Sequence, residues 1–236
     1  MLAEPLRWRT PRKVFVNSMS DVGHARVGRS FVARTWEAQH HLDYALAASR
    51  DIAPGVPGDA PVELTPLCQA YLGVARAYQG HTDDALRLTG QAVGSARRLG
   101  DPFGLAYFLF CYAWAATVAE EVTRVLDSAT EAEALAGKPG FRRWGNPMQF
   151  FQGWAEARSG DPCRGEQRIR AGLAEMDATE TRAFRPFALG LLAETQLLAG
   201  RPDQAADTLR LATEEAGRLG EHVHDPQLRA LQARLR

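Results

Sequence analysis

Turn residues recur along this chain at a spacing of 40 residues, and this repeat limits the fold more than any other feature. Gly80, Gly160 and Gly200 each follow one helical pattern and precede another, and Glu120 stands at the matching place between the first two. Glycine commonly ends a helix because it tolerates a left-handed backbone. The Asp, Thr or Pro residues that come next are favoured at helix starts. The spacing therefore predicts repeated pairs of helices joined by tight turns.

Small side chains recur in the same register within these units. Two antiparallel helices approach each other closely only where the side chains between them are small. Eleven of twelve such positions hold Gly or Ala, and the exception is Val125. They lie seven residues before, five after and twelve after each turn: Gly73, Ala113, Gly153, Ala193, Ala85, Val125, Gly165, Ala205, Ala92, Ala132, Gly172 and Ala212. We therefore predict an all-α fold, a right-handed superhelical solenoid of about five antiparallel helix pairs.

The repeat also predicts where the helices lie. The expected ranges are 24–34, 36–50, 64–79, 82–99, 102–117, 120–136, 143–158, 162–177, 183–199 and 202–219, and residues 226–236 open a further unit. The first pair fits less well, because Arg26 stands where a small residue is expected. Residues 1–22 lack periodicity, which predicts a loose N-terminal tail before a single repeat domain of residues 23–236.

Composition narrows the classes of partner and the location. The 28 basic residues are balanced by 28 acidic residues, so no global charge attracts nucleic acid or an anionic membrane. No uncharged apolar stretch is long enough for a transmembrane helix, and the N-terminus lacks the apolar core of a signal peptide. Three widely spaced cysteines without a CxxC pair are typical of a reducing compartment. We expect a cytoplasmic protein that binds neither nucleic acid through this segment nor membrane.

One unit of the repeat carries a recognisable signature. The stretch Leu72–Val93 holds Leu-Gly, a turn Gly, an Asp and two Ala at the places where a tetratricopeptide repeat (TPR) has them. The stretch Trp36–Leu46 resembles the second helix of such a repeat. A standard unit has about 34 residues, so the 40-residue unit is similar to the longer-helix variants. The resemblance implies a solenoid that binds a partner.

A second resemblance covers residues 36–236. It rests on Gly100–Ala106, on Gly153–Ala155 and on Arg185–Phe187 with Leu191–Glu194. These motifs are similar to the C-terminal repeats of bacterial LuxR-type regulators of the maltose-activator kind and of adenylate-cyclase-like signalling ATPases. The sequence has no Walker GxxxxGK[ST], cyclase or helix-turn-helix motif, so the resemblance implies only the sensing or docking part of such a regulator. Whether the chain is a short protein or a piece of a longer one stays open.

The first helix of each unit is expected to line the concave face, the usual binding surface of a solenoid. Aromatic residues fall there in the two middle repeats, with arginines at the edge. The predicted set is Tyr107, Phe110, Trp114, Arg143, Phe150, Trp154, Arg158, Arg185, Phe187 and Glu194. An exposed patch of this kind would bind a peptide helix or an apolar small molecule. Aromatic stripes at helical spacing also commonly pack in the core, and the sequence leaves both alternatives open.

Patterns typical of catalysis or metal binding are weak. His222, His224 and Asp225 share one segment without a distant ligand pair, so we interpret them as a solvated connection and not as a zinc site. The sequence contains no GxSxG motif and no phosphate-binding glycine loop. We therefore expect no catalytic residue, no metal, no cofactor and no enzyme activity.

Three functions remain as alternatives. The first is a non-catalytic protein–protein interaction or effector-sensing module of a bacterial transcriptional or signalling regulator. The second is a stand-alone solenoid that binds an apolar small molecule as a ligand-controlled switch. The third is an enzyme with an unrecognised concave site, for which only Glu194 and a few arginines qualify. The expected partner is a protein or peptide, and the incomplete unit at 226–236 leaves open a homodimer or a continuation of the repeat.

Overall fold

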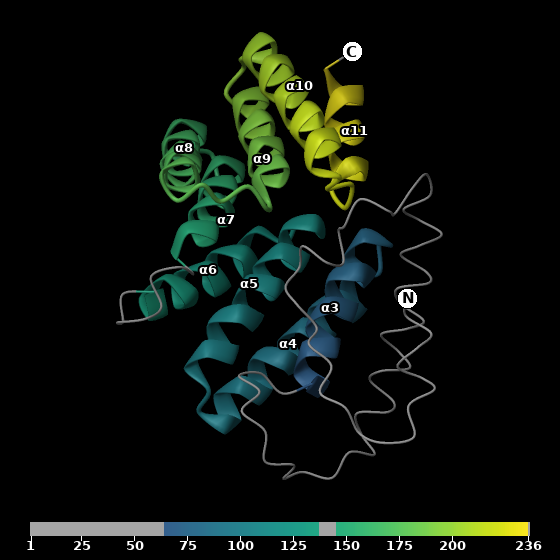
Figure 1. The fold of residues 1–236 in the computed structure, drawn as a ribbon, viewed down its shortest axis with the longest axis vertical. Coiled ribbons are helices and arrows are strands. Elements are labelled where there is room, and N and C mark those ends of the chain that lie inside the picture. Colours follow the sequence, from purple (N-terminus) through teal and green to yellow (C-terminus); the bar gives the residue numbers. More distant parts are fainter. Residues whose placement is uncertain (1–63, 137–144, 236) are drawn as a thin grey trace.

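The computed structural model describes residues 64–136 and 145–235, and all regular secondary structure in these two ranges is α-helical. Figure 1 labels the helices: α3 Leu64–Tyr78, α4 Thr82–Leu99, α5 Pro102–Val118, α6 Val122–Ala136, α7 Gly145–Arg158, α8 Pro162–Ala178, α9 Arg185–Leu198, α10 Pro202–Leu219 and α11 Asp225–Arg234. The all-α prediction is confirmed. The predicted helices 82–99 and 202–219 match α4 and α10 at both ends, whereas the predicted tail 1–22 and the first predicted pair lie outside the described residues.

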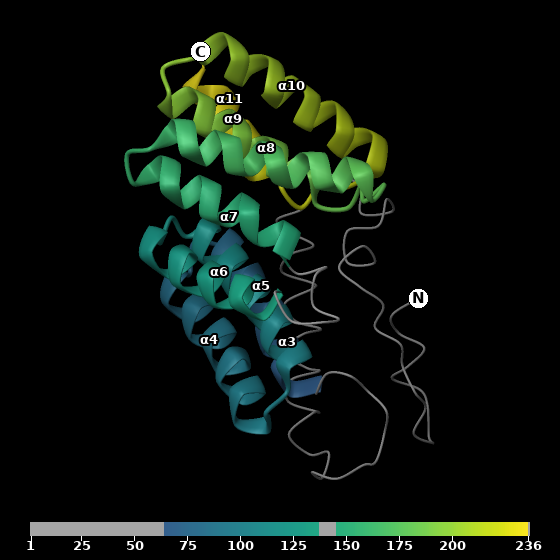
Figure 2. The ribbon, with the colours of Figure 1, turned by 90° about the vertical axis from the view of Figure 1, so that its left-hand side faces the viewer.

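The helices form two layers that rise together through a stack of helix pairs. Each pair, such as α3 with α4 or α7 with α8, packs against the next, and Figure 2 shows the pairs following one another along the long axis. The first helices of the units, α3, α5, α7, α9 and α11, contact one another in sequence and form an inner layer. Each second helix contacts its own partner and the first helix of the following unit. This arrangement is a TPR-like helical-repeat solenoid.

The predicted turns separate the helices of each pair. Gly160 and Gly200 have φ values of 104° and 72°, in the left-handed region that glycine adopts without a steric cost. Glu120, which lacks a neighbouring glycine, adopts the same region with φ 60°. Asp161 then begins α8, because its carboxylate accepts a 3.0 Å hydrogen bond from the backbone N–H of Arg164.

The twelve small positions lie where the helices approach one another, and all are buried. A Cβ atom added to Gly153 of α7 would lie 2.6 Å from the carbonyl oxygen of Gly165 and 2.7 Å from Cγ1 of Ile169, both in α8. A Cβ added to Gly73 would lie 2.6 Å from Cγ2 of Thr89 in the next helix. The helices of a pair therefore pack backbone to backbone at these points, as the repeat predicts. Within the described ranges, no helix is long and apolar enough to cross a membrane.

Candidate functional site

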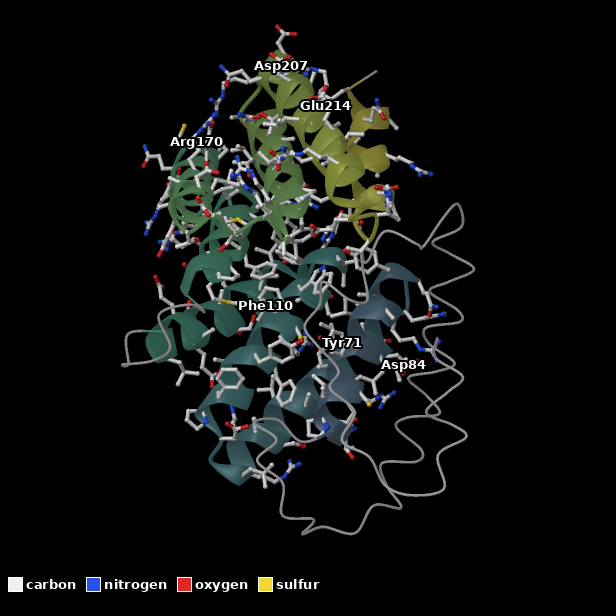
Figure 3. All side chains as sticks on the ribbon, viewed as in Figure 1. Tyr71, Asp84, Phe110, Arg170, Asp207 and Glu214 are labelled. Atoms are coloured by element: carbon white, nitrogen blue, oxygen red, sulfur yellow. The ribbon has the colours of Figure 1, made fainter. Side chains whose placement is uncertain are left out.

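The inner layer gathers aromatic rings into one cluster. Phe184, just before α9, lies at its centre, with ring centroids 4.7 Å from Phe187, 5.0 Å from Trp114 and 5.2 Å from Phe110. Figure 3 labels Phe110 near the middle of the molecule. We define the aromatic cluster as Tyr78, Phe110, Trp114, Phe151, Phe184, Phe187 and His224. Three of the predicted concave residues are thus in direct contact.

These rings are packed between helices. Phe110, Trp114 and Phe187 are 4%, 5% and 3% exposed, and Trp154 is buried as well. Tyr107 is half-buried, and its hydroxyl donates a 2.5 Å hydrogen bond to the hydroxyl of Tyr71 (labelled in Figure 3). Of the two alternatives for the aromatic stripe, the geometry is that of core packing. A partner therefore reaches this region only where the inner layer opens beside the cluster.

Phe150 and Phe151 lie differently from the predicted arrangement. Phe150 packs against α8, where a Cβ added to Gly172 would lie 2.5 Å from its ring. Its neighbour Phe151 joins the aromatic cluster instead, with centroids 5.7 Å from Phe110 and 6.0 Å from Phe187. One residue turns a helix by about 100°, so a register error of one residue exchanges the two faces of α7.

His224 corrects the expected solvated connection, because its side chain is fully buried. Nε1 of Trp114 donates a 3.0 Å hydrogen bond to the hydroxyl of Tyr78, which lies 2.8 Å from Nδ1 of His224. Tyr78 therefore donates to Nδ1, and the ring proton resides on Nε2. Burial lowers the pKa of His224, and the nearby Glu221 and Asp225 carboxylates offset only part of that effect. The sequence offered no signal for this contact, since Tyr78 and His224 are 146 residues apart.

The turn before α11 also holds the loop before α9. Both carboxylate oxygens of Glu221 accept hydrogen bonds from the backbone N–H of Phe184, at 3.0 and 3.1 Å. Phe184 has φ 71°, a left-handed conformation that is costly for a bulky residue. Nε2 of His224 lies 3.3 Å from Oε1 of the same Glu221. The carboxylate thus fixes a strained residue at the centre of the aromatic cluster.

Beside the cluster, Glu194 of α9 collects three polar groups. Its side chain is largely buried, and Oε2 accepts a 2.8 Å hydrogen bond from Nε1 of Trp154. Arg158 lies 3.2 Å from the other oxygen, stacks over the Trp154 ring at 5.2 Å and reaches Glu120 at 2.9 Å. Arg234 of α11 approaches Glu194 at 3.5 Å. The structure therefore brings together Trp154, Arg158 and Glu194 of the predicted set.

The other predicted arginines do not join this group. Arg185 forms ion pairs with Glu215 at 3.0 Å and with Asp177 at 2.9 Å, and its side chain is mostly buried. These partners belong to α10 and α8, so Arg185 ties second helices to α9. Arg143 lies outside the described residues.

A half-open pocket of about 160 Å³ lies between the inner-layer helices at this point. It is bounded by the C-terminal ends of α5 and α7, by α9 and by α11. Four residues of the predicted set line it, namely Trp154, Arg158, Phe187 and Glu194. Leu228 and Leu231 of α11 form an apolar wall that sequence reasoning missed.

The pocket is suited to binding. Its walls combine aromatic and aliphatic side chains with a few polar groups, the usual composition of a ligand site. The arginines Arg158 and Arg234 balance the carboxylates of Glu120 and Glu194. Within residues 64–136 and 145–235, no group of three or more His, Cys, Asp or Glu side chains is arranged to hold a metal ion.

Solved structures with the same architecture are repeat proteins. The apo form of RapI aligns with a TM-score of 0.58 at 11% sequence identity, covering 86% of this chain and 77% of that chain. A Podosopora anserina putative kinesin light chain with nearly identical TPR-like repeats aligns with a TM-score of 0.50 at 16% identity, covering 86% and 89%. A single-substitution variant of that kinesin light chain aligns with a TM-score of 0.52 at 14% identity, covering 79% and 88%. These similarities support the TPR-like fold.

Sequence comparisons concern a different part of the chain. The profile of a family described as a protein of unknown function (DUF5131) matches residues 1–51. That segment lies outside the described residues and crosses the predicted boundary between the tail and the repeat domain, which stays a prediction. No curated protein sequence matches the chain. The resemblance to LuxR-type regulators also stays a prediction.

Proposed function

We propose that this solenoid is a non-catalytic interaction module that binds a protein or peptide at the pocket between α5, α7, α9 and α11. One observation carries the proposal. Side chains that the repeat places on the partner-facing surface, Trp154, Arg158, Phe187 and Glu194, line a single pocket on the inner layer. Inner-layer surfaces are where helical solenoids commonly bind their partners.

The size of the pocket favours one residue of a larger partner over a whole effector molecule. Pockets for drug-sized ligands have volumes of about 300–1,000 Å³, whereas this pocket has about 160 Å³. Burying one apolar side chain contributes about 1.5–3 kcal/mol, too little for stable association alone. The remaining affinity would come from contacts on the surrounding surface, as in a peptide that inserts a single anchor residue.

The wider setting of the module is also part of the proposal. The resemblance of residues 36–236 to the repeats of LuxR-type regulators supports an effector-sensing or docking role in a bacterial transcriptional or signalling regulator in the cytoplasm. A homodimer remains a further arrangement of the same module, with a second copy as the partner.

A second candidate function is a switch controlled by an apolar small molecule. The observation in its favour is that α11 borders the pocket through Leu228 and directly follows His224 of the aromatic cluster. A ligand that moves Leu228 would therefore act on the contact between His224 and Tyr78. A rise in melting temperature with a saturating apolar ligand, without a protein partner, would distinguish this function.

The leading proposal is tested by site-specific photo-cross-linking in a lysate of the source cells. A benzophenone side chain at Ala230, which is exposed at the pocket, is expected to capture a discrete partner. The matched control is Ala233, which is exposed on the same helix and does not line the pocket. Equal capture from Ala230 and Ala233, or capture from Ala233 alone, would contradict binding at the pocket.

A further inference from the structure

Three buried polar atoms at the pocket form no hydrogen bond within the described part of the chain. They are Nε of Arg158, Nε2 of His224 and Oε1 of Gln227, and all three residues line the pocket. Buried polar side-chain atoms usually have a hydrogen-bond partner, so a group of exceptions in one place requires a physical explanation. The pocket supplies one, because a bound molecule there would meet these atoms.

Two of these atoms already have a charged neighbour. Nε of Arg158 lies 3.2 Å from Glu194, and Nε2 of His224 lies 3.3 Å from Glu221, but neither pair has hydrogen-bond geometry. The charge of the arginine is thereby compensated, while both N–H groups remain available as donors. Gln227 has no such neighbour for its side-chain oxygen.

The three atoms specify what a ligand must offer. Arg158 presents an N–H donor, and so does His224, because its Nδ1 accepts from Tyr78 and the ring proton lies on Nε2. Gln227 presents an acceptor. A complementary group therefore carries an oxygen acceptor beside an N–H donor.

Charge and size restrict the ligand further. Two arginines, Arg158 and Arg234, face two carboxylates, Glu120 and Glu194, so an additional ligand charge would be left uncompensated. An apolar cavity of about 150 Å³ holds a molecule of the size of benzene, and this pocket has about 160 Å³. An uncharged head group on an apolar body of one side chain's size fits both limits.

We infer that the pocket binds an uncharged amide attached to a small apolar body. Its carbonyl oxygen accepts from the Arg158 and His224 donors, its N–H donates to Gln227, and its apolar part lies between Phe187 and Leu231. The inference rests on the proposed function, in which the amide is the backbone of one apolar residue of the partner. A free small-molecule amide has the same chemistry.

Small probes test this inference on the complete protein. In a calorimetric titration, N-acetyl-leucine N-methylamide is expected to bind saturably, and N-acetyl-leucine, which carries a carboxylate, at least tenfold more weakly. Tighter binding of the N-methylamide than of isovaleramide indicates a peptide residue, and the reverse order indicates a free amide. Equal binding of amide and acid, or no saturation by either amide, would overturn the inference.

Two variants locate the binding. Gln227→Met keeps the side-chain length and removes the acceptor, which is expected to weaken binding of the amide about three- to tenfold, the effect of one hydrogen bond. Gln232→Met changes an exposed residue of the same helix that does not line this pocket and is expected to leave binding unchanged. Circular dichroism melting of both variants verifies the fold. Unchanged amide binding by folded Gln227→Met would overturn the inference.

The probes and the cross-link separate two failures. If Ala230 captures a partner but no amide binds, the amide inference is wrong and the proposed function stands. If the amide binds and depends on Gln227, but Ala230 captures no partner, the proposed protein partner is wrong and the pocket remains an amide site.

Discussion

The hydroxyl of Tyr78 lies 2.8 Å from Nδ1 of His224, and this hydrogen bond joins the first described helix to the turn before the last one. Repeat solenoids are held mainly by contacts between neighbouring units. Here the end of α3 also meets the start of α11, and Trp114 of α5 completes the contact through its bond to Tyr78. The curvature of the inner layer is therefore fixed by a direct contact across it, and the pocket lies beside that contact.

We expect Tyr78→Phe to destabilise the fold by about 1–3 kcal/mol, because it leaves Nε1 of Trp114 and Nδ1 of His224 without this partner in a buried site. Urea denaturation followed by circular dichroism measures the change. The control is Tyr112→Phe, which removes only a 3.0 Å hydrogen bond to the exposed Arg124. Equal losses in the two variants would contradict a special role of the Tyr78 contact.

The buried His224 predicts that the protein loses stability in mild acid. Its pKa in the folded protein lies below the value of about 6.5 expected in the unfolded chain. Below pH 6.5 the unfolded chain therefore binds a proton that the folded protein does not. The free energy of unfolding should fall by up to about 1.4 kcal/mol per pH unit as the pH decreases from 6.5 toward the folded-state pKa.

Urea denaturation at several pH values between 5 and 7 measures this slope. His224→Gln should flatten it, because the variant has no imidazole to titrate. His222→Gln, at a partly exposed neighbour, should keep the slope of the unchanged protein. A slope that survives in His224→Gln would assign the effect to another group.

Much of the fold could be predicted because it depends on neighbouring units. The close approach of Gly153 to Gly165 follows from the same register that repeats every 40 residues. The turn glycines set the ends of the helices in the same way. Such contacts need only the sequence of one unit and its partner, and the periodic pattern contains that information.

The site could be predicted only in part. Trp154, Arg158 and Glu194 were found because they occupy equivalent positions of the repeat. His224 and Phe184 were not, because their contacts depend on how far the stack curves, which small angles between all units determine together. A pattern within one unit carries no information on that sum.

Glu194→Ala is expected to cost about 2 kcal/mol of stability, because it leaves the Trp154 N–H unpaired and removes the carboxylate facing Arg158. Arg234→Ala removes only a 3.5 Å ion pair of a side chain that is 45% exposed, and should cost less than about 1 kcal/mol. Thermal melting of the two variants gives the comparison. A larger loss for Arg234→Ala would show that Glu194 is not the centre of this group.

Gly153→Ala should destabilise the protein by about 1–3 kcal/mol, because the added methyl group would lie 2.6 Å from the backbone oxygen of Gly165 and backbone yields only at a cost. The same substitution at Gly217, in the second half of α10, meets no atom within 4 Å and should stabilise by about 0.5–1 kcal/mol through helix propensity. The two variants share their chemistry, so opposite shifts in the urea midpoint would isolate the close contact between α7 and α8. If both substitutions stabilised the protein, these helices would be farther apart than the repeat requires, and the packing that defines the solenoid would be wrong at that unit.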